Sequence, residues 1–141
     1  MDRCPECDQS GKAYCKACNS AHWKNNFANW TSGDSSIDEL IQESQINASN
    51  DYEIIEWIPY DDLDQTTLFA SGGFGSIYKS VWKSGPLSNY YVDGGVRPYH
   101  GSFWNSEKSE WNRLSDRVVA IKKINNQTSG FIREVTRQSV F

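Results

Sequence analysis

The sequence predicts an α+β fold, in which a small antiparallel sheet follows a cysteine-rich segment and a helix. Three patterns indicate this arrangement. The cysteines all fall within residues 1–33, apolar residues recur with helical spacing over residues 34–50, and short apolar runs alternate with turn-forming residues over residues 51–141. A chain of 141 residues is long enough for one ordinary domain or two small ones.

Two Cys-x-x-Cys pairs carry the chemistry of the first segment: Cys4 with Cys7, and Cys15 with Cys18. Two intervening residues let both sulfurs of a pair face one metal ion, and four thiolates form the closed tetrahedral site that is typical of structural Zn²⁺. Disulfides are disfavoured in a reducing compartment, although disulfides or free thiols remain the alternative. Because the segment has few apolar residues, we expect zinc to supply its stability, which amounts to roughly 10–16 kcal/mol in small zinc fingers.

The residues that follow the last cysteine are aromatic. His22 is not needed as a metal ligand, and we interpret it as a surface residue. Trp23, Phe27 and Trp30 recur at spacings of four and three, which indicates one face of a helix. We expect this face to pack beneath the cysteine segment, and the alternative is an exposed aromatic surface that docks a protein partner.

A connecting helix is predicted over residues 34–50. Its start has the spacing of a capping box, either Ser35 with Asp38 or Ser36 with Glu39. The residues on its apolar face are Ile37, Leu40, Ile41 and Ala48. The polar run at 47–50 is a plausible end.

Short apolar runs after residue 51 indicate strands at 54–58, 68–70, 77–82 and 117–124. The second and third runs flank a glycine-rich turn, which is typical of a hairpin. Residues 83–116 are rich in Gly, Ser, Asn, Pro and Tyr, and we interpret them as a long surface insertion. Residues 129–138 have the pattern of a helix start.

The glycine-rich turn is the most informative part of the sequence. Small residues there let backbone N–H groups approach phosphate oxygens, because no Cβ atoms stand in the way. We expect Phe74 at the tip to shield the phosphates from solvent and Ile77 to contact the face of an adenine. The residues of this candidate ATP-binding loop are Phe69, Ala70, Ser71, Gly72, Gly73, Phe74, Gly75, Ser76 and Ile77.

A lysine on the next strand strengthens this interpretation. Residues 118–122 read Val-Val-Ala-Ile-Lys, which matches the Val-Ala-Ile-Lys signature of protein kinases, whose lysine contacts the α- and β-phosphates. The segment 131–135 then offers Glu134, which looks like the glutamate of helix αC that pairs with that lysine. Residues 67–124 therefore resemble the N-terminal lobe of a eukaryotic protein kinase of the Ser/Thr or tyrosine-kinase-like group.

The likeness extends along the chain to a large fungal family of kinase-domain proteins with an N-terminal Cys4 knuckle, through residues 30–33, 37–42 and 56–60. It implies a partial N-lobe, with antiparallel strands and part of helix αC, that binds ATP with Mg²⁺ and pairs Lys122 with Glu134. Two features depart from a standard kinase. Ala70 stands where kinases have the first glycine of the loop, and Lys123 is a competing lysine that strand alternation puts on the opposite face.

Charge and hydropathy exclude several partners. The formal net charge is −4 and the longest basic run is Lys122-Lys123, which argues against a nucleic acid or an anionic membrane. The sequence has no apolar stretch that could span a bilayer and no hydrophobic segment of a secretory signal near its beginning. We therefore expect a cytoplasmic or nuclear protein that is not secreted and has no membrane partner.

The sequence contains neither a His-Arg-Asp nor an Asp-Phe-Gly motif, on which phosphoryl transfer by kinases depends. We therefore expect a truncated, pseudokinase-like chain with weak or no ATP binding in isolation, and whether it is an enzyme stays open. Three functions fit: a kinase-family chain with a partial ATP site, a zinc-dependent protein-interaction module with a non-catalytic kinase remnant, or a non-functional truncated product. In the second, a protein partner binds the cysteine segment or an uncovered face of the sheet.

Overall fold

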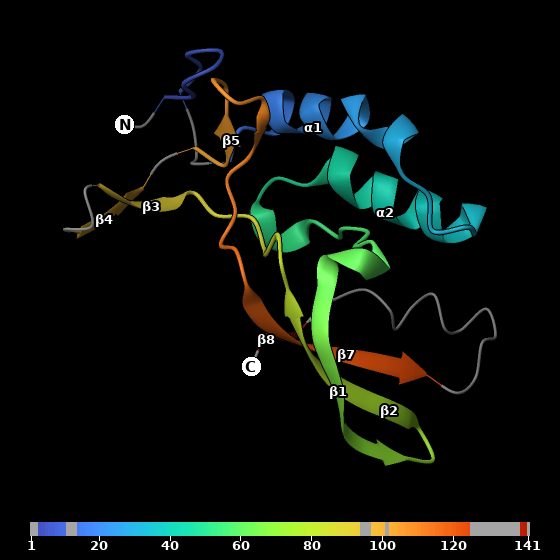
Figure 1. Ribbon diagram of the computed structural model, residues 1–141. Helices are drawn as coiled ribbons and strands as arrows, with labels where there is room; N and C mark the ends of the chain where they lie inside the picture. Colours follow the sequence, from blue (N-terminus) through green and yellow to red (C-terminus); the bar gives the residue numbers. More distant parts are fainter. Residues whose placement is uncertain (1–2, 11–13, 94–96, 101, 125–138, 141) are drawn as a thin grey trace. The chain divides into compact units, whose positions relative to one another are not determined.

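The computed structural model of the chain describes residues 3–10, 14–93, 97–100, 102–124 and 139–140 (Figure 1). The fold is α+β, as the sequence predicts: the described residues form two α-helices, several antiparallel strand pairs and a cluster of four cysteines. The chain divides into two compact units, one of Met1–Trp57 with Leu87–Arg113 and one of Ile58–Pro86 with Leu114–Phe141. Among the described residues, no helix is long and apolar enough to cross a membrane.

The first unit contains the two α-helices that the described residues form. Helix α1 spans Lys16–Asn25 and α2 spans Ser35–Asn47, and short 3₁₀ turns follow at Phe27–Asn29 and Asp51–Glu53. This unit also contains two antiparallel strand pairs: β3 (Tyr90–Asp93) pairs with β4 (Arg97–His100), and β5 (Trp104–Asn105) pairs with β6 (Glu110–Trp111).

The N-cap of helix α2 lies one residue before the first expected capping serine and two before the second. This N-cap is Asp34, whose carboxylate accepts hydrogen bonds from the backbone N–H groups of Ser36 at 2.8 Å and Ile37 at 3.2 Å. The prediction that Ser35 or Ser36 caps the helix was wrong, because both serines already lie inside the first turn. A cap of this kind satisfies N–H groups that have no partner within the helix.

Asp38 has a different role from the one expected of it. Its carboxylate accepts hydrogen bonds from the backbone N–H of Ser32 at 2.8 Å and from the hydroxyls of Ser32 and Thr31, both at 2.5 Å. The hydroxyl of Ser32, followed by that of Thr31, lowers the pKa of Asp38 below its usual value. Asp38 therefore fixes the loop that enters α2 instead of closing a capping box.

The core of the first unit joins distant parts of the sequence. Tyr14, Ala48 and Phe103 are buried together, and three partly buried residues pack against them: Ile54, Leu87 and Trp111. Phe103, Leu87 and Trp111 come from the stretch expected to be a surface insertion. The structure therefore groups the chain differently from the expected segments 1–33, 34–50 and 51–141, because residues 87–113 carry aromatic side chains that the overall polar composition conceals.

The apolar run at 54–58 forms no strand in the structure. Its backbone is bonded instead by side chains of α2: the N–H of Ile55 donates to Ser44 Oγ at 3.1 Å, and the carbonyl of Ile55 accepts from Gln45 Nε2 at 2.9 Å. The expectation of a strand here was wrong, because polar groups on the helix replace a neighbouring strand as hydrogen-bond partners.

The second unit is an antiparallel sheet in the order β1-β2-β7-β8 (Figure 1). Its strands are β1 (Leu63–Gly72), β2 (Gly75–Trp82), β7 (Arg117–Ile124) and β8 (Ser139–Val140). The predicted hairpin and third strand are thus confirmed as secondary structure. The helix start expected at residues 129–138 lies outside the described residues.

Backbone hydrogen bonds join the segment that follows β2, residues 83–86, to the segment that precedes β7, residues 114–116. The N–H of Asp116 donates to the carbonyl of Lys83 at 2.9 Å, and the N–H of Leu114 donates to the carbonyl of Pro86 at 3.0 Å. Gly85 has φ +75°, and a Cβ there would lie 1.7 Å from the Leu114 carbonyl oxygen, so only glycine fits. Residues 87–113 are therefore inserted between two adjacent strands whose ends are held together.

We expect Asp34→Ala to lower the free energy of unfolding by about 1 kcal/mol, the usual effect of removing an N-cap side chain. Urea denaturation followed by circular dichroism measures this. Ser35→Ala is the matched control, because Ser35 is the first residue of α2 and lies exposed. Equal destabilisation by both variants would contradict the assignment of Asp34 as the cap.

Candidate metal centre and glycine loop

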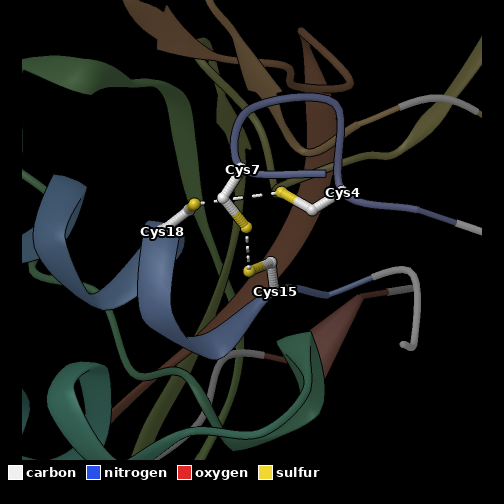
Figure 2. A group of neighbouring side chains, drawn as sticks. All are labelled: Cys4, Cys7, Cys15 and Cys18. Atoms are coloured by element: carbon white, nitrogen blue, oxygen red, sulfur yellow. Dashed lines mark hydrogen bonds between the residues drawn. The ribbon is translucent and has the colours of Figure 1, made fainter. Parts of the chain in front are cut away.

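The four cysteines come from two adjacent elements of the first unit. Cys4 and Cys7 lie in a tight turn, closed by hydrogen bonds from Cys4 N–H to the Gln9 carbonyl at 2.9 Å and from Asp8 N–H to the Cys4 carbonyl at 2.8 Å. Cys15 is the residue before α1, and Cys18 lies in its first turn. The turn and the start of the helix therefore present two sulfurs each to a common point, as Figure 2 shows.

The sulfurs have the spacing of a tetrahedral metal site. All four Sγ atoms lie within 4.8 Å of one another, and the Cys4–Cys18 and Cys7–Cys15 pairs are each 3.8 Å apart. A tetrahedron with metal–sulfur bonds of about 2.3 Å has edges of about 3.8 Å. All four are free thiols rather than disulfides. The predicted cluster is thus close enough to hold one metal ion.

Burial and the neighbouring sulfurs shift the pKa values of three of these thiols. Burial raises the pKa of Cys18, and the neighbouring sulfur of Cys7 raises it further. Burial also raises the pKa of Cys15. At Cys4 burial opposes ionisation too, but the backbone N–H groups of Cys7 and Glu6 lower its pKa below the value of an ordinary thiol. Thiolates at Cys15 and Cys18 therefore need a compensating positive charge, which a bound cation would supply.

His22 and Trp23 lie on α1 just beyond the cysteines and both contact the inserted residues. His22 is partly buried, and its Nε2 lies 2.6 Å from Glu6 Oε1, so the expectation of a surface residue was wrong. Trp23 is only 4% exposed and stacks on Trp111 with ring centroids 4.3 Å apart. Trp23 is packed as expected, although its partners include the insertion. The expected helical face is wrong beyond it, because α1 ends at Asn25, before Phe27 and Trp30.

Sequence reasoning missed the residues that His22 and Trp23 contact. Trp104 and Trp111 are cross-strand partners in the β5–β6 hairpin. The signal that was available is local: two tryptophans, each followed or preceded by a polar residue, flank the polar turn at 106–109. Such a pair of aromatic residues across a short turn is typical of a hairpin.

The glycine loop is the two-residue turn between β1 and β2. Cross-strand pairs Ala70↔Ile77, Ser71↔Ser76 and Gly72↔Gly75 lead into the turn formed by Gly73 and Phe74. Gly75 has φ +139°, and a Cβ on it would lie 2.0 Å from the carbonyl oxygen of Lys123 on β7. Glycine is therefore required at this position for β2 and β7 to pair.

Lys122 lies on β7 near the tip of this loop. It is the direct cross-strand partner of Ile77, and side chains of directly paired residues point to the same face of a sheet. Its Nζ lies 5.7 Å from the centroid of the Phe74 ring. Lys123 pairs with Ser76, so its side chain belongs to the opposite face, as alternation predicts. Glu134 lies outside the described residues, so its pairing with Lys122 stays a prediction.

Comparisons with known proteins identify no relative: no family model, no curated protein and no solved structure matches this chain. The likeness to protein kinases therefore rests on sequence motifs, chiefly those of the glycine loop and the lysine strand. The metal cluster rests on the geometry of the four sulfurs.

We expect Gly75→Ala to lower the free energy of unfolding by about 2 kcal/mol or more, because the added methyl meets the Lys123 carbonyl and φ is positive. Gly73→Ala is the control, since a Cβ there has no neighbour within 4 Å and its φ is not in the strained region. Urea denaturation of both variants tests this difference. If Gly75→Ala is as stable as Gly73→Ala, the described pairing of β2 with β7 is wrong.

Proposed function

We propose that this chain binds one structural zinc ion through Cys4, Cys7, Cys15 and Cys18. The observation that carries the proposal is the 3.8 Å separation of two sulfur pairs, which equals the edge of a tetrahedral Zn–S₄ site. Four sulfurs fill every position of a tetrahedral ion and leave none for a substrate. The role that fits is therefore stabilisation of the fold and not catalysis.

The surroundings of the cluster support a stabilising role. Residues 3–10 contain no buried side chain, and a few backbone hydrogen bonds hold their turn together. Zinc would join this turn to α1 through two sulfurs from each element. Binding of zinc in small modules contributes roughly 10–16 kcal/mol, far more than such a turn gains from its own contacts.

The zinc proposal predicts about one zinc ion per purified chain and loss of helical circular dichroism when a strong chelator removes it. Cys18→Ser should lower zinc content sharply, because a hydroxyl is a poor zinc ligand. Ser20→Ala is the control: Ser20 lies on the same helix, is not a cluster residue, and donates its hydroxyl to the Ala17 carbonyl at 3.3 Å. A metal-free chain whose circular dichroism does not respond to chelation would contradict the proposal.

A second candidate function, binding of nucleotide phosphates, is supported by the position of Lys122. Its cross-strand pairing with Ile77 and its distance of 5.7 Å from the Phe74 ring put a cation beside the tip of a glycine-rich turn. Phosphate binding needs backbone N–H groups free of Cβ obstruction and a nearby lysine. The resemblance to protein kinases makes ATP with Mg²⁺ the nucleotide expected here.

Two details are compatible with this second function. Ala70, which replaces a glycine of the kinase pattern, lies in β1 opposite Ile77 and is not among the residues with positive φ, so its methyl group causes no backbone strain. The cation–π contact of Lys122 with Phe74 contributes only about 0.5–1 kcal/mol at an exposed site. Phosphate oxygens therefore compete easily for the lysine.

ATP with Mg²⁺ should raise the thermal midpoint of the second unit, because a ligand that binds only the native state adds about 2.7 kcal/mol at a hundred times its Kd. Lys122→Ala should abolish this shift. Lys123→Ala, on the opposite face of β7, should leave it unchanged. Differential scanning fluorimetry measures the thermal midpoint of the native chain and of both variants, with and without ATP and Mg²⁺. The absence of any shift in the native chain, or its equal loss in both variants, would refute the proposed phosphate site.

A further inference from the structure

The β5–β6 hairpin packs against one face of α1. Its two tryptophans meet edge to face, with ring centroids 5.0 Å apart. Trp111 stacks on Trp23 at 4.3 Å, and Trp104 stacks on His22 at 3.7 Å with an interplanar angle of 10°. The contact of the hairpin with the helix therefore consists mainly of two parallel ring pairs.

The hairpin is ordered by its own backbone as well as by this contact. Asn112 donates its backbone N–H to the Phe103 carbonyl at 2.8 Å and its side-chain amide to the Ser102 carbonyl at 2.5 Å. Next to it, the guanidinium of Arg113 forms two hydrogen bonds with the carboxylate of Glu56, at 2.5 and 3.1 Å. Residues 102–113 are thus joined by their own hydrogen bonds and pack against α1.

His22 joins this hairpin to the cysteine cluster. Its ring face lies on Trp104, while its Nε2 lies 2.6 Å from a carboxylate oxygen of Glu6. Glu6 stands between Cys4 and Cys7, and its side chain is 19% exposed. The histidine therefore contacts the cysteine turn with its edge and the hairpin with its face.

His22 lies on the same face of α1 as one of the four cysteines. Cys18 precedes His22 by four residues, so both side chains lie on the same face of α1. A metal ion held by four sulfurs fixes the turn that carries Glu6 against that face. Without the metal, the carboxylate is held near the imidazole only by the turn itself.

We propose that metal binding and docking of the β5–β6 hairpin are coupled, with His22 as the positioning residue between them. The inference rests on the proposed metal site and adds a regulated segment to it. The metal fixes the turn that carries Glu6. The Glu6 carboxylate then bonds to Nε2 of His22, and the imidazole oriented in this way stacks on Trp104. Loss of the metal should release residues 102–113 while leaving the β1–β2 hairpin of the other unit intact.

Hydrogen exchange followed by mass spectrometry tests this in the full chain, with zinc bound and after chelation. We expect zinc to slow exchange in residues 102–113 at least tenfold, with little change in β1 and β2. Glu6→Ala and His22→Phe should keep zinc but lose most of that protection. Glu6→Gln should retain it, because an amide oxygen still bonds to the imidazole.

Coupling is reciprocal, so the hairpin must also affect the metal. Trp104→Ala should weaken zinc binding about tenfold in competition with a chelator, whereas Trp57→Ala, which changes a tryptophan outside the aromatic cluster, should not. A chain that takes up no zinc overturns both this inference and the metal site. A chain that binds zinc, yet shows the same exchange in residues 102–113 with and without it, overturns the coupling alone, as does full protection in both Glu6→Ala and His22→Phe.

Discussion

The convergence of four sulfurs on one point is the constraint on which the first unit depends. It joins a turn with no buried side chain to the first turn of α1, and α1 then presents His22 and Trp23 to the rest of the unit. The buried apolar residues of this unit are few, and several of them are aromatic rings that pack across long sequence separations. Contacts between residues far apart in sequence have a high loop-closure entropy cost, which a metal ion joining the turn to α1 would reduce.

The insertion between β2 and β7 gives the chain an unusual path. Gly85 and the hydrogen bonds beside it hold the two ends of the insertion together. The strands β2 and β7 therefore pair directly, although residues 87–113 separate them in the sequence. Ser80 and Val119, which pair across these strands, are almost fully buried. Of these two strands, β2 carries one end of the glycine loop and β7 carries Lys122. The register of β2 with β7, which puts Lys122 beside the loop, is therefore maintained by the hydrogen bonds between residues 83–86 and 114–116 and by this buried pair.

Local patterns could be predicted from the sequence, and long-range contacts could not. The cysteine spacing, the hairpin around the glycine turn and the lysine on the third strand each depend on residues a few positions apart. The docking of Trp104 and Trp111 on α1 joins residues about eighty positions apart, and nothing in the local pattern specifies such a contact. The N-cap was misplaced by one or two residues, because Asp34, Ser35 and Ser36 are all good caps and only the true start of the helix distinguishes them.

The metal centre is the part of the account on which the other inferences about the first unit rest. X-ray absorption at the zinc edge of the purified chain observes its ligands directly. The account predicts a single shell of four sulfur atoms at about 2.3 Å, with no nitrogen or oxygen neighbour. A shell that contains nitrogen or oxygen ligands, or fewer than four sulfurs, would contradict the assignment of Cys4, Cys7, Cys15 and Cys18 as a closed structural site.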